Sequence, residues 1–599
     1  MSGSSRRDFF AAASAFGASA AALAMLPHAV SAMPSAAHVT PQPDPMPSTD
    51  ATSADILVDA LITWGAPFVF GVVGDGVNSI IEALRKKQDR IRFIPVRHEE
   101  AAAFMAGGVA KHTGKLGVCI GTTGPGAVHL LNGLYDAHFD SAPVLAITGT
   151  TFHDLIGTRF MQSVDTVALM KDVACYNVEI TSPGHALIVA NRACRAALGN
   201  RGVAHLTIAK DTQMMKLSAD KPSMENHGLR TSSSFLPMTD APDAEQLRAA
   251  ADLLNGGSKV AIMVGQGALG ARAEVTQLAE LLGAPVAKAL LGKGVLPDDS
   301  PLTTGGTGHL GTMPSEWAMH SCDTVLILGS TMPWIDSYPK PGQARGIQVD
   351  INADRIGLRY PVEIGLVGDV RTTLRALMPL LHRKSDRAFL SQAQAHMRDW
   401  NALLDAVEKS DRSPLRPQRV VRALSDRLKE DAVISLDCGA NTHFAARHLR
   451  LRAGQQLTGT GMLASMAPGL PFANAAQLCF PNRQSVAVVG DGGFAQLMAE
   501  LTTSVQNKLP VKIVILKNNS LSEVRFEQKD LGNPEFGCDL SPIDFVAFAK
   551  ACGADGFACS TPADLDSAMD AFLASPNAAV LEATVDPNEP PAKPEQLKA

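Results

Sequence analysis

The sequence predicts an α/β protein made of three doubly wound domains, each built on a parallel sheet. Short runs rich in valine, isoleucine and leucine alternate with helical patterns along most of the chain, as buried parallel strands and their crossover helices do. A polar stretch at about 218–240 and a charged helical connector after residue 383 divide this alternation into three blocks. The 599 residues suffice for about three to four domains, and 46% hydrophobic residues are typical of a globular protein.

Charge and cysteine content narrow the classes of function. The formal net charge is −6, so no overall basic field attracts nucleic acid or an anionic membrane. The nine cysteines are scattered and form no C-x-x-C pair, which argues against a zinc site or a disulfide framework. We therefore expect no nucleic-acid partner, and we expect no integral membrane span in the mature chain because no later stretch is long and apolar enough.

Residues 1–32 have the pattern of a twin-arginine signal peptide. Arg6-Arg7 precede an alanine-rich apolar run that ends at Leu26, and small residues follow at Ala29 and Ala32. An ordinary N-terminal helix is the alternative interpretation. Residues 33–51 are rich in proline and serine and are expected to form a flexible spacer. The pattern predicts export to the periplasm by the twin-arginine route.

The three blocks cover residues 52–217, 242–383 and 416–586. In the first block the expected strands are Phe68–Val73, Ile91–Val96, Leu116–Ile120 and Val144–Ile147, with helices at Asn78–Lys86 and Glu100–Lys111. In the second block they are Lys259–Val264, Thr324–Leu328 and Gly346–Val349. In the third block they are Ala432–Leu436, Ser485–Val489, Val511–Leu516 and Ala579–Ala583. Doubly wound sheets bind ligands at the carboxyl ends of such strands.

The third block carries a pattern typical of a metal–diphosphate site. Gly490-Asp491-Gly492-Gly493 follows one strand, and Asn518 follows the next strand, after an amphipathic helix expected at Phe494–Gln506. A strand–helix–strand unit brings the two strand ends side by side, so Asp491 and Asn518 can share one ion, with the Ser520 carbonyl as a third ligand. Oxygen ligands suit Mg²⁺, and Gly492 and Gly493 let backbone N–H groups approach a diphosphate. A turn followed by an unrelated cap is the alternative interpretation.

At this point the chain resembles the thiamine-diphosphate-dependent enzymes, and the resemblance covers about residues 52–590. It implies a pyrimidine-binding domain, a central domain and a diphosphate-binding domain. In the first of these, Arg97-His98-Glu99 resembles the family segment whose glutamate contacts the aminopyrimidine ring and promotes ionisation of the thiazolium ring. Without the resemblance, Glu99 reads as a carboxylate that a helix N-terminus favours, here facing an apolar segment.

The resemblance implies further contacts to thiamine diphosphate and a two-chain site. Met466 matches the large hydrophobe that holds the bend of the cofactor, although core packing also explains a methionine. Gln162 matches a glutamine near the active site, and Glu523 stands where relatives project a residue into it, beside Ser522, which replaces the usual glycine. The remaining implied cofactor contacts are Thr123, Gly124, Ala464, Ser465, Leu521 and Val524. Because the family forms its site between two chains, a homodimer or homotetramer is expected.

The second block contains a literal G-x-G-x-x-G, Gly265 to Gly270, after a strand. The acidic residue that NAD-binding folds place about 20 positions later is absent, so NAD is weakly supported. The later glycine-rich segments instead resemble the FAD-binding central domain of pyruvate oxidases and quinone-dependent pyruvate dehydrogenases. The implied FAD contacts are Gly308, Leu310, Gly311, Gly329, Ser330 and Asp350. Some relatives keep this fold without flavin, so redox use of FAD stays open.

The resulting expectation is an oxidoreductase that decarboxylates a 2-oxo acid, with pyruvate as the first choice, and passes electrons through FAD to a quinone or oxygen. Glu99, Gln162 and Glu523 are its expected catalytic residues. An acetolactate synthase-like carboligase or a non-oxidative decarboxylase is the alternative, and an inactive cofactor-binding relative is a third interpretation.

Overall fold

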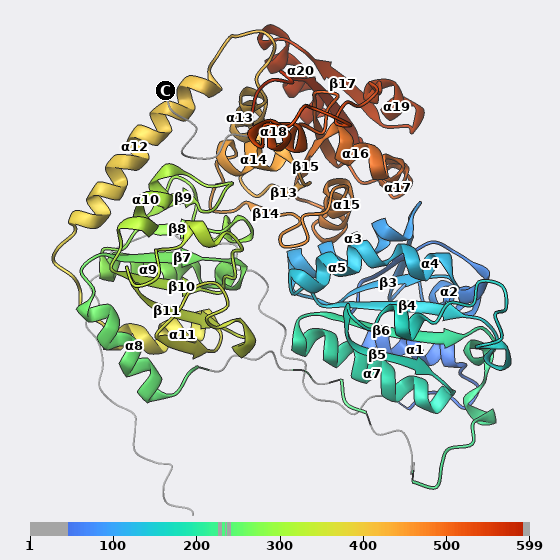
Figure 1. Cartoon of the computed structure of the whole chain (residues 1–599). Helices are drawn as coiled ribbons and strands as arrows, with labels where there is room; N and C mark the ends of the chain where they lie inside the picture. The colour runs from blue at the N-terminus through green and yellow to red at the C-terminus, as the bar shows by residue number, and fades with distance from the viewer. Residues whose placement is uncertain (1–45, 226–230, 234, 236–240, 591–599) are drawn as a thin grey trace, which may run out of the picture. The chain divides into compact units, whose positions relative to one another are not determined.

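The computed structural model describes residues 46–225, 231–233, 235 and 241–590. The predicted signal peptide and most of the predicted spacer lie outside these residues. The described chain contains three six-stranded sheets in which all neighbouring strands are parallel, with helices against both faces of each sheet (Figure 1). The predicted fold class, three doubly wound parallel-sheet domains, is therefore confirmed.

The N-terminal domain has the strand order β2-β1-β3-β4-β6-β5. Its strands are β1 Phe68–Gly71, β2 Arg92–Pro95, β3 Gly117–Gly121, β4 Val144–Thr150, β5 Ala174–Ile180 and β6 Val203–Ala209. Its helices are α1 Ser53–Thr63, α2 Asn78–Lys86, α3 Glu99–Thr113, α4 Pro125–His129, α5 Leu131–Phe139, α6 Thr166–Leu169 and α7 Pro183–Asn200. Strands β3, β4 and β6 are buried along their whole length, so their polar residues are buried too, and Thr148 and His205 hydrogen-bond each other.

The middle domain has the order β12-β11-β10-β7-β8-β9, the arrangement of a dinucleotide-binding sheet. Its strands are β7 Val260–Val264, β8 Val286–Lys288, β9 Thr303–Gly306, β10 Thr324–Leu328, β11 Arg345–Asp350 and β12 Ile364–Val367. Its helices are α8 Ala244–Gly256, α9 Arg272–Leu282, α10 Met313–Ser321 and α11 Val370–Leu377. The long helix α12, Ala388–Glu408, connects it to the next domain. The strand order changes direction between β7 and β10, which places the ligand crevice after these two strands.

The C-terminal domain repeats the strand pattern of the N-terminal domain, with the order β14-β13-β15-β16-β18-β17. Its strands are β13 Val433–Leu436, β14 Gln456–Thr458, β15 Ser485–Gly490, β16 Lys512–Lys517, β17 Asp555–Cys559 and β18 Ala579–Thr584. Its helices are α13 Pro417–Arg427, α14 Ala440–His448, α15 Gly469–Cys479, α16 Asp491–Leu497, α17 Leu501–Gln506, α18 Ser522–Asp530, α19 Phe545–Ala551 and α20 Pro562–Ala574.

The single helix expected over 494–506 is wrong. The structure has α16 starting at Asp491, a 3₁₀ turn η10 at Met498–Glu500, and then α17. The break lets the buried carboxylate of Glu500 accept a hydrogen bond from Thr503 Oγ1, at 2.7 Å, and from backbone groups of the N-terminal domain. Strands β5, β6, β8, β9, β12, β14 and β17 were not among the expected strands, because several are short or begin with polar residues.

Among the described residues, several buried contacts join the C-terminal domain to the other domains, and two of them are packing of α3 on α15 and an ion cluster. Helix α3 packs on α15, where the rings of Phe104 and Phe472 meet edge to face with centroids 5.8 Å apart. A β-carbon on Gly108 would lie 2.9 Å from that of Ala475, so glycine is required for this approach. Among the described residues, no helix is long and apolar enough to cross a bilayer.

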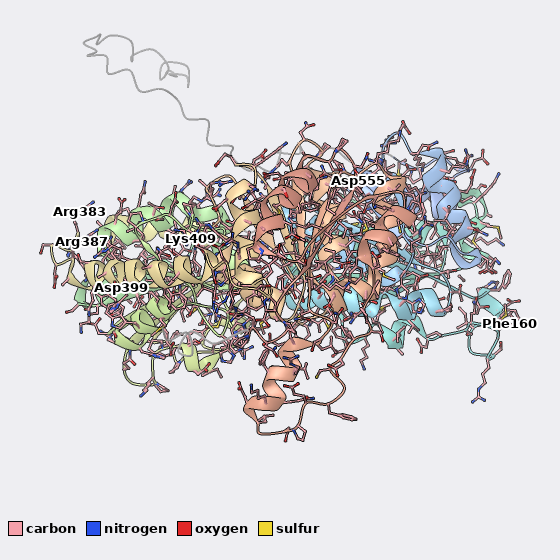
Figure 2. The ribbon with its side chains drawn as sticks, turned by 90° about the horizontal axis from the view of Figure 1, so that it is seen from above. Phe160, Arg383, Arg387, Asp399, Lys409 and Asp555 are labelled. Carbon is pink, nitrogen blue, oxygen red and sulfur yellow. The ribbon has the colours of Figure 1, made fainter. Side chains whose placement is uncertain are left out.

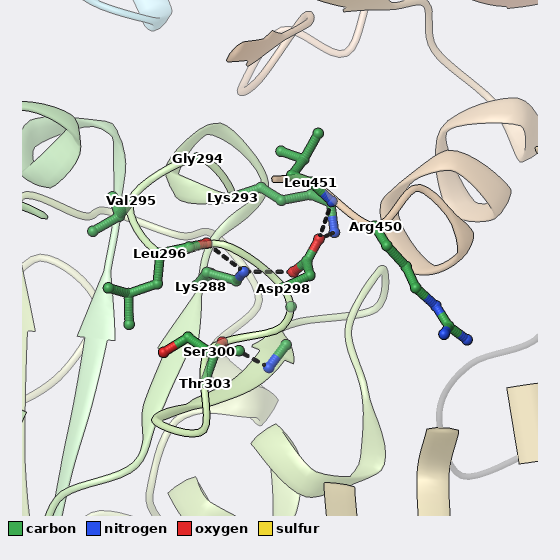
Figure 3. A network of polar contacts seen from close by, with 12 residues as sticks. Lys288, Lys293, Gly294, Val295, Leu296, Asp298, Ser300, Thr303, Arg450 and Leu451 are labelled. Carbon is green, nitrogen blue, oxygen red and sulfur yellow. Dashed lines mark hydrogen bonds and ion pairs between the residues drawn. The ribbon is translucent and has the colours of Figure 1, made fainter. Parts of the chain in front are cut away.

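Figure 3 shows the second contact, a buried ion cluster between the middle and C-terminal domains. Asp298 receives hydrogen bonds from Lys288 Nζ at 2.5 Å and from Lys293 Nζ at 2.7 Å. Its Oδ2 also accepts the backbone N–H of Leu451 at 2.8 Å. Burial lowers the pKa of Lys288 to about 8, and the two ammonium groups hold the pKa of Asp298 at about 2 against the cost of burial.

Candidate cofactor site

Asp491 and Asn518 lie at the carboxyl ends of adjacent parallel strands. In the register of β15 and β16, Gly490 pairs with Leu516, so the residues that follow meet at one edge of the sheet. The Oδ2 atom of Asp491 accepts the backbone N–H of Asn519 at 2.6 Å and of Asn518 at 3.2 Å. Burial raises the pKa of Asp491, while these N–H groups lower it. The structure thus brings the two predicted strand ends together.

The turn after Asn518 supplies further oxygen atoms. Asn518 Oδ1 accepts the N–H of Ser520 at 3.0 Å, and Asn519 takes a left-handed φ of 54°. The hydroxyl of Ser520 is buried and has no hydrogen-bond partner among the described residues. The carboxylate of Asp491, the amide oxygen of Asn518 and the carbonyl of Ser520 are all oxygen donors, the type of ligand that a hard cation such as Mg²⁺ prefers.

Side chains pack closely on Gly492 and Gly493 at this turn. A β-carbon on Gly492 would lie 2.9 Å from Leu521 and 3.5 Å from the methyl group of Met466, and one on Gly493 would lie 2.9 Å from Asp437. Met466 and Leu521 therefore join the same cluster. Val524, by contrast, is 45% exposed one turn into α18.

Asp437 was missed by the sequence analysis. It follows β13, which neighbours β15, so Asp437 and Asp491 flank the point where the strand order of the domain reverses. Its Oδ1 accepts the backbone N–H of Cys438 at 2.7 Å and of Ala467 at 2.8 Å. Burial raises the pKa of Asp437 to about 7. The rule that selected Asp491, an acid directly after a buried strand, also selects Asp437.

The loop that carries Ala464, Ser465 and Met466 is anchored in the N-terminal domain. The carboxylate of Asp140 accepts the N–H of Gly461 at 2.8 Å and of Met462 at 3.0 Å. The buried ammonium of Lys111 donates to Asp140, to Asp136 and to the carbonyl of Gly459. Ala464 and Ala467 have left-handed φ values of 54° and 85°. This backbone conformation costs free energy, which the anchoring contacts offset.

Glu99 is the first residue of α3 and is 7% exposed. Its Oε2 lies 2.9 Å from Nδ1 of His129, a residue missed by the sequence analysis although it closely follows the glycine-rich segment at 121–126. The expectation that Glu99 faces an apolar segment did not include this imidazole, which lies beside its carboxylate. The neighbouring Glu100 points elsewhere: its carboxylate accepts a hydrogen bond from Asn132, which also donates to Ser465 Oγ.

The segment that holds Thr123 and Gly124 continues to Gly126, beside this acid, and packs on Gln162. A β-carbon on Gly126 would meet Glu99 Oε1 at 3.1 Å, and one on Gly124 would meet Gln162 at 2.8 to 2.9 Å. Thr123 is buried, and its hydroxyl has no partner among the described residues. Gln162 is exposed and follows Phe160, which Figure 2 shows at the outer edge of the N-terminal domain. The predicted residues thus form two groups, one in the N-terminal domain and one in the C-terminal domain.

A cavity of about 1100 Å³ opens at the strand-order reversal of the middle domain. Four of the six predicted FAD contacts line it, namely Leu310, Gly329, Ser330 and Asp350. Gly308 instead lines a separate small cavity, and Gly311 lines neither. Arg201 and Arg355 line the large cavity too, so cationic groups are available to an anionic ligand.

The same cavity continues to the C-terminal domain, where Asp437, Ala464 and Glu523 form part of its wall. Glu523 Oε1 lies 3.2 Å from Nε2 of His443, another residue of the wall that was not predicted. The other side-chain polar atoms of this pair, Glu523 Oε2 and His443 Nδ1, are buried without a partner among the described residues.

Three domain families of thiamine pyrophosphate enzymes match the chain. The N-terminal TPP binding domain matches residues 51–169, the central domain 247–377 and the C-terminal TPP binding domain 437–583. The YdaP protein of Bacillus subtilis, which is named as containing thiamine pyrophosphate, is 39% identical over 90% of this chain and 92% of its own length. The chain belongs to the thiamine pyrophosphate enzyme family.

Other relatives in the family carry more specific names. Pyruvate oxidase of Lactiplantibacillus plantarum is 31% identical over 85% of this chain and 84% of its own length. The acetolactate synthase large subunit of Porphyra purpurea is 28% identical over 90% of this chain and 93% of its own length. An oxidase and a synthase are both similar to this chain along nearly its whole length. The similarity therefore establishes the family but does not distinguish the two reactions.

The described residues fit the cofactor of this family. Asp491, Asn518 and Ser520 offer oxygen ligands for a cation that neutralises a diphosphate, and Gly492 lies at the N-terminal end of α16. The partnerless hydroxyl of Ser520 and the packing around Gly492 and Gly493 are consistent with a cradle for the diphosphate. Met466, next to this cradle, is placed to contact the rest of the cofactor.

Proposed function

We propose that this enzyme oxidatively decarboxylates a 2-oxo acid, pyruvate being the first substrate to test, and passes the electrons through FAD to a quinone or oxygen. With water as acyl acceptor, one pyruvate and one water yield acetate, carbon dioxide, two protons and two electrons. The electrons and protons reduce a quinone to its quinol, or oxygen to hydrogen peroxide. The similarity to a pyruvate oxidase along most of both chains supports this substrate and this reaction class.

The observation that carries the redox part is the shared cavity. One continuous space is lined by Ala464 and Glu523 of the C-terminal domain and by Gly329 and Asp350 of the middle domain. A thiamine cofactor held at Asp491 and a flavin held in the middle domain would therefore be neighbours. Bound thiamine diphosphate supplies an electron sink at its thiazolium ring, and bound FAD supplies a two-electron acceptor.

The residues of the chain have distinct roles in this proposal. Asp491, Asn518 and the Ser520 carbonyl bind Mg²⁺, which anchors the diphosphate. Glu99 hydrogen-bonds the aminopyrimidine ring and holds the proton that controls its tautomer. Gln162 orients the substrate, and Glu523 shapes the wall of the cavity on which the substrate and the flavin meet.

The proposal includes a homodimer or homotetramer with sites shared between chains. Among the described residues, no side-chain hydrogen bond or ion pair of Glu99 reaches the C-terminal domain, whereas Glu100 is linked to Ser465 through Asn132. The helix start at Glu99 packs on the C-terminal domain of its own chain, since Ala101 and Ala467 share one core cluster. The similarity to pyruvate oxidase supports the oligomer and, with it, a role for Glu99 at a neighbouring chain's cofactor. The exposed side chain of Gln162, beside Gly124, supports the same arrangement.

We also propose a periplasmic location reached by the twin-arginine route. Arg6-Arg7, the alanine-rich run and the small residues before residue 33 support it. N-terminal sequencing of the protein recovered from the periplasm would show a chain that starts near residue 33, whereas an intact N-terminus in the cytoplasm would contradict this part.

A carboligase of the acetolactate synthase type is the second candidate, favoured by the similarity to acetolactate synthase over 90% of the chain. One experiment separates the two. The purified enzyme, with thiamine diphosphate and Mg²⁺, is mixed with pyruvate without oxygen while its absorption spectrum is recorded. Bleaching of a flavin band and reduction of an added quinone analogue support the oxidase, whereas acetolactate with an unchanged flavin band supports the carboligase. A protein without flavin contradicts the oxidative route.

A further inference from the structure

Glu500 belongs to the C-terminal domain, but its carboxylate ends on the turn that carries Glu99. The Oε1 atom of Glu500 accepts the backbone N–H of Arg97 at 2.8 Å and of His98 at 3.0 Å. These two residues directly precede Glu99, the first residue of α3. Glu500 is 1% exposed, and burial raises the pKa of its carboxyl group.

The backbone N–H groups of Arg97 and His98 depend on the Glu500 carboxylate as their hydrogen-bond acceptor. They lie between the last residue of β2 and the first turn of α3, so neither the sheet nor the helix supplies their partner. A carboxylate from another domain takes that place. Because one oxygen binds two successive N–H groups, it restrains both the position and the direction of the backbone just before Glu99.

The carboxylate of Glu500 is itself held from its own side. Its Oε2 accepts a hydrogen bond from Thr503 Oγ1 at 2.7 Å. Glu500 ends the 3₁₀ turn that follows α16, and α16 begins at Asp491. The short segment from Asp491 to Glu500 therefore connects the predicted metal ligand with the side chain that restrains the backbone before Glu99.

A second set of contacts crosses the same interface without touching the backbone of the turn. The guanidinium of Arg97 donates from Nε to Thr502 Oγ1 at 2.8 Å and from Nη2 to Gln506 Oε1 at 3.0 Å. Both contacts are exposed. They offer a matched control, because they join the same two domains and spare the two N–H groups.

We propose that Glu500 is a positioning residue that fixes Glu99 for its contact with the aminopyrimidine ring. This inference rests on the proposed function, because it gives Glu99 the role of activating the cofactor. Glu500 does not touch the cofactor in this proposal; it acts through the backbone of residues 97–98. Loss of its carboxylate should therefore slow activation of the cofactor while leaving diphosphate binding at Asp491 nearly intact.

The test compares Glu500→Ala and Glu500→Gln with the control Thr502→Ala. In protein without cofactor, amide hydrogen exchange of a peptide covering residues 97–101 should quicken in the Ala variant only. With thiamine diphosphate and Mg²⁺, the affinity for the cofactor should stay within about threefold of the unmodified enzyme. The rate at which the thiazolium C2 proton exchanges with deuterium should fall about tenfold or more in the Ala variant, since small misplacements of a reacting group cost that much. Gln keeps one acceptor oxygen and should restore most of the rate.

Four outcomes decide between these possibilities. Exchange of the C2 proton at the unmodified rate in Glu500→Ala overturns the inference, and so does an equal loss in Thr502→Ala. If the Ala variant fails to fold, Glu500→Asp replaces it. The Asp side chain is one methylene shorter, so its carboxylate should reach the two N–H groups less well. An unmodified C2 exchange rate in that variant also overturns the inference. An unmodified enzyme that does not accelerate C2 exchange overturns the proposed function itself, so the two failures are distinguishable.

Discussion

The imidazole of His443, on α14, lies 3.2 Å from the carboxylate of Glu523, on α18, in the wall of the large cavity. The pair joins two helices that both begin near the predicted diphosphate end, and it lies beside the predicted substrate space.

We expect His443→Leu to raise the KM for an anionic 2-oxo acid by about tenfold, or about 1.4 kcal/mol, because the carboxylate of Glu523 then faces the substrate without its imidazole partner. The double variant His443→Leu with Glu523→Leu should recover most of the affinity. Steady-state kinetics of the single and double variants measure this, with Glu527→Gln as the control on an exposed acid of the same helix. An unchanged KM in His443→Leu would contradict the expectation.

Replacing Glu99 with Gln should lower kcat by about a hundredfold or more, because the amide cannot share a proton with the aminopyrimidine ring. Binding of thiamine diphosphate should survive, since Asp491 and Asn518 are untouched. Turnover and calorimetric titration with the cofactor check both parts. Glu100→Gln, at the adjacent position that contacts Asn132, is the control and should keep most of the activity. A fully active Glu99→Gln enzyme would refute the assignment.

Asp491→Ala should abolish retention of the cofactor and of Mg²⁺, because it removes the anionic ligand and the acceptor of the Asn518 and Asn519 N–H groups. Thiamine and magnesium content after gel filtration measures the loss. Asp539→Ala is a useful comparison, since Asp539 pairs through its backbone with Ser520 and its side chain should be dispensable. Full thiamine and magnesium content in Asp491→Ala would contradict the assignment of Asp491 as a metal ligand.

The Asp298 cluster predicts a specific acid sensitivity. The two lysines hold the pKa of Asp298 at about 2 in the folded protein, below its ordinary value of 3.8. A lowered carboxyl pKa gives stability that is present above the unfolded value and is lost as pH falls from about 4 toward 2. The contribution at neutral pH is of order 2 kcal/mol. Thermal melting of the unmodified protein and of Asp298→Asn between pH 7 and pH 3 should show a gap that narrows as the pH falls; a constant gap would exclude this origin.

The parts of the site that follow from neighbouring strands could be predicted from the sequence. Asp491 and Asn518 each follow a buried apolar run, and parallel pairing of β15 and β16 suffices to bring them together. Glu99 required the family resemblance, because an acid at a helix start has an ordinary explanation. His129, His443 and Glu500 could not be found this way, since their roles depend on contacts between elements that are far apart in the chain.

The break at Met498–Glu500 shows the same limit within one helix. The residues of 494–506 suit a continuous amphipathic helix, and no glycine or proline interrupts them. The contacts of Glu500 with Arg97, His98 and Thr503 favour a tighter turn instead. Tertiary hydrogen bonds thus outweigh local propensity, and only the folded chain reveals them.

The anchoring of Gly461 and Met462 by Asp140 has a consequence for dissecting this enzyme. A fragment that starts at residue 416 would keep the carboxyl ends of β15 and β16, with Asp491 and Asn518, and should still bind a pyrophosphate. It would lack the Asp140 carboxylate, which holds the backbone shortly before Met466. The ring end of a bound cofactor would then have less support. In the proposed site, binding of the diphosphate and support of the rest of the cofactor therefore depend on different parts of the chain, and only the second needs the N-terminal domain.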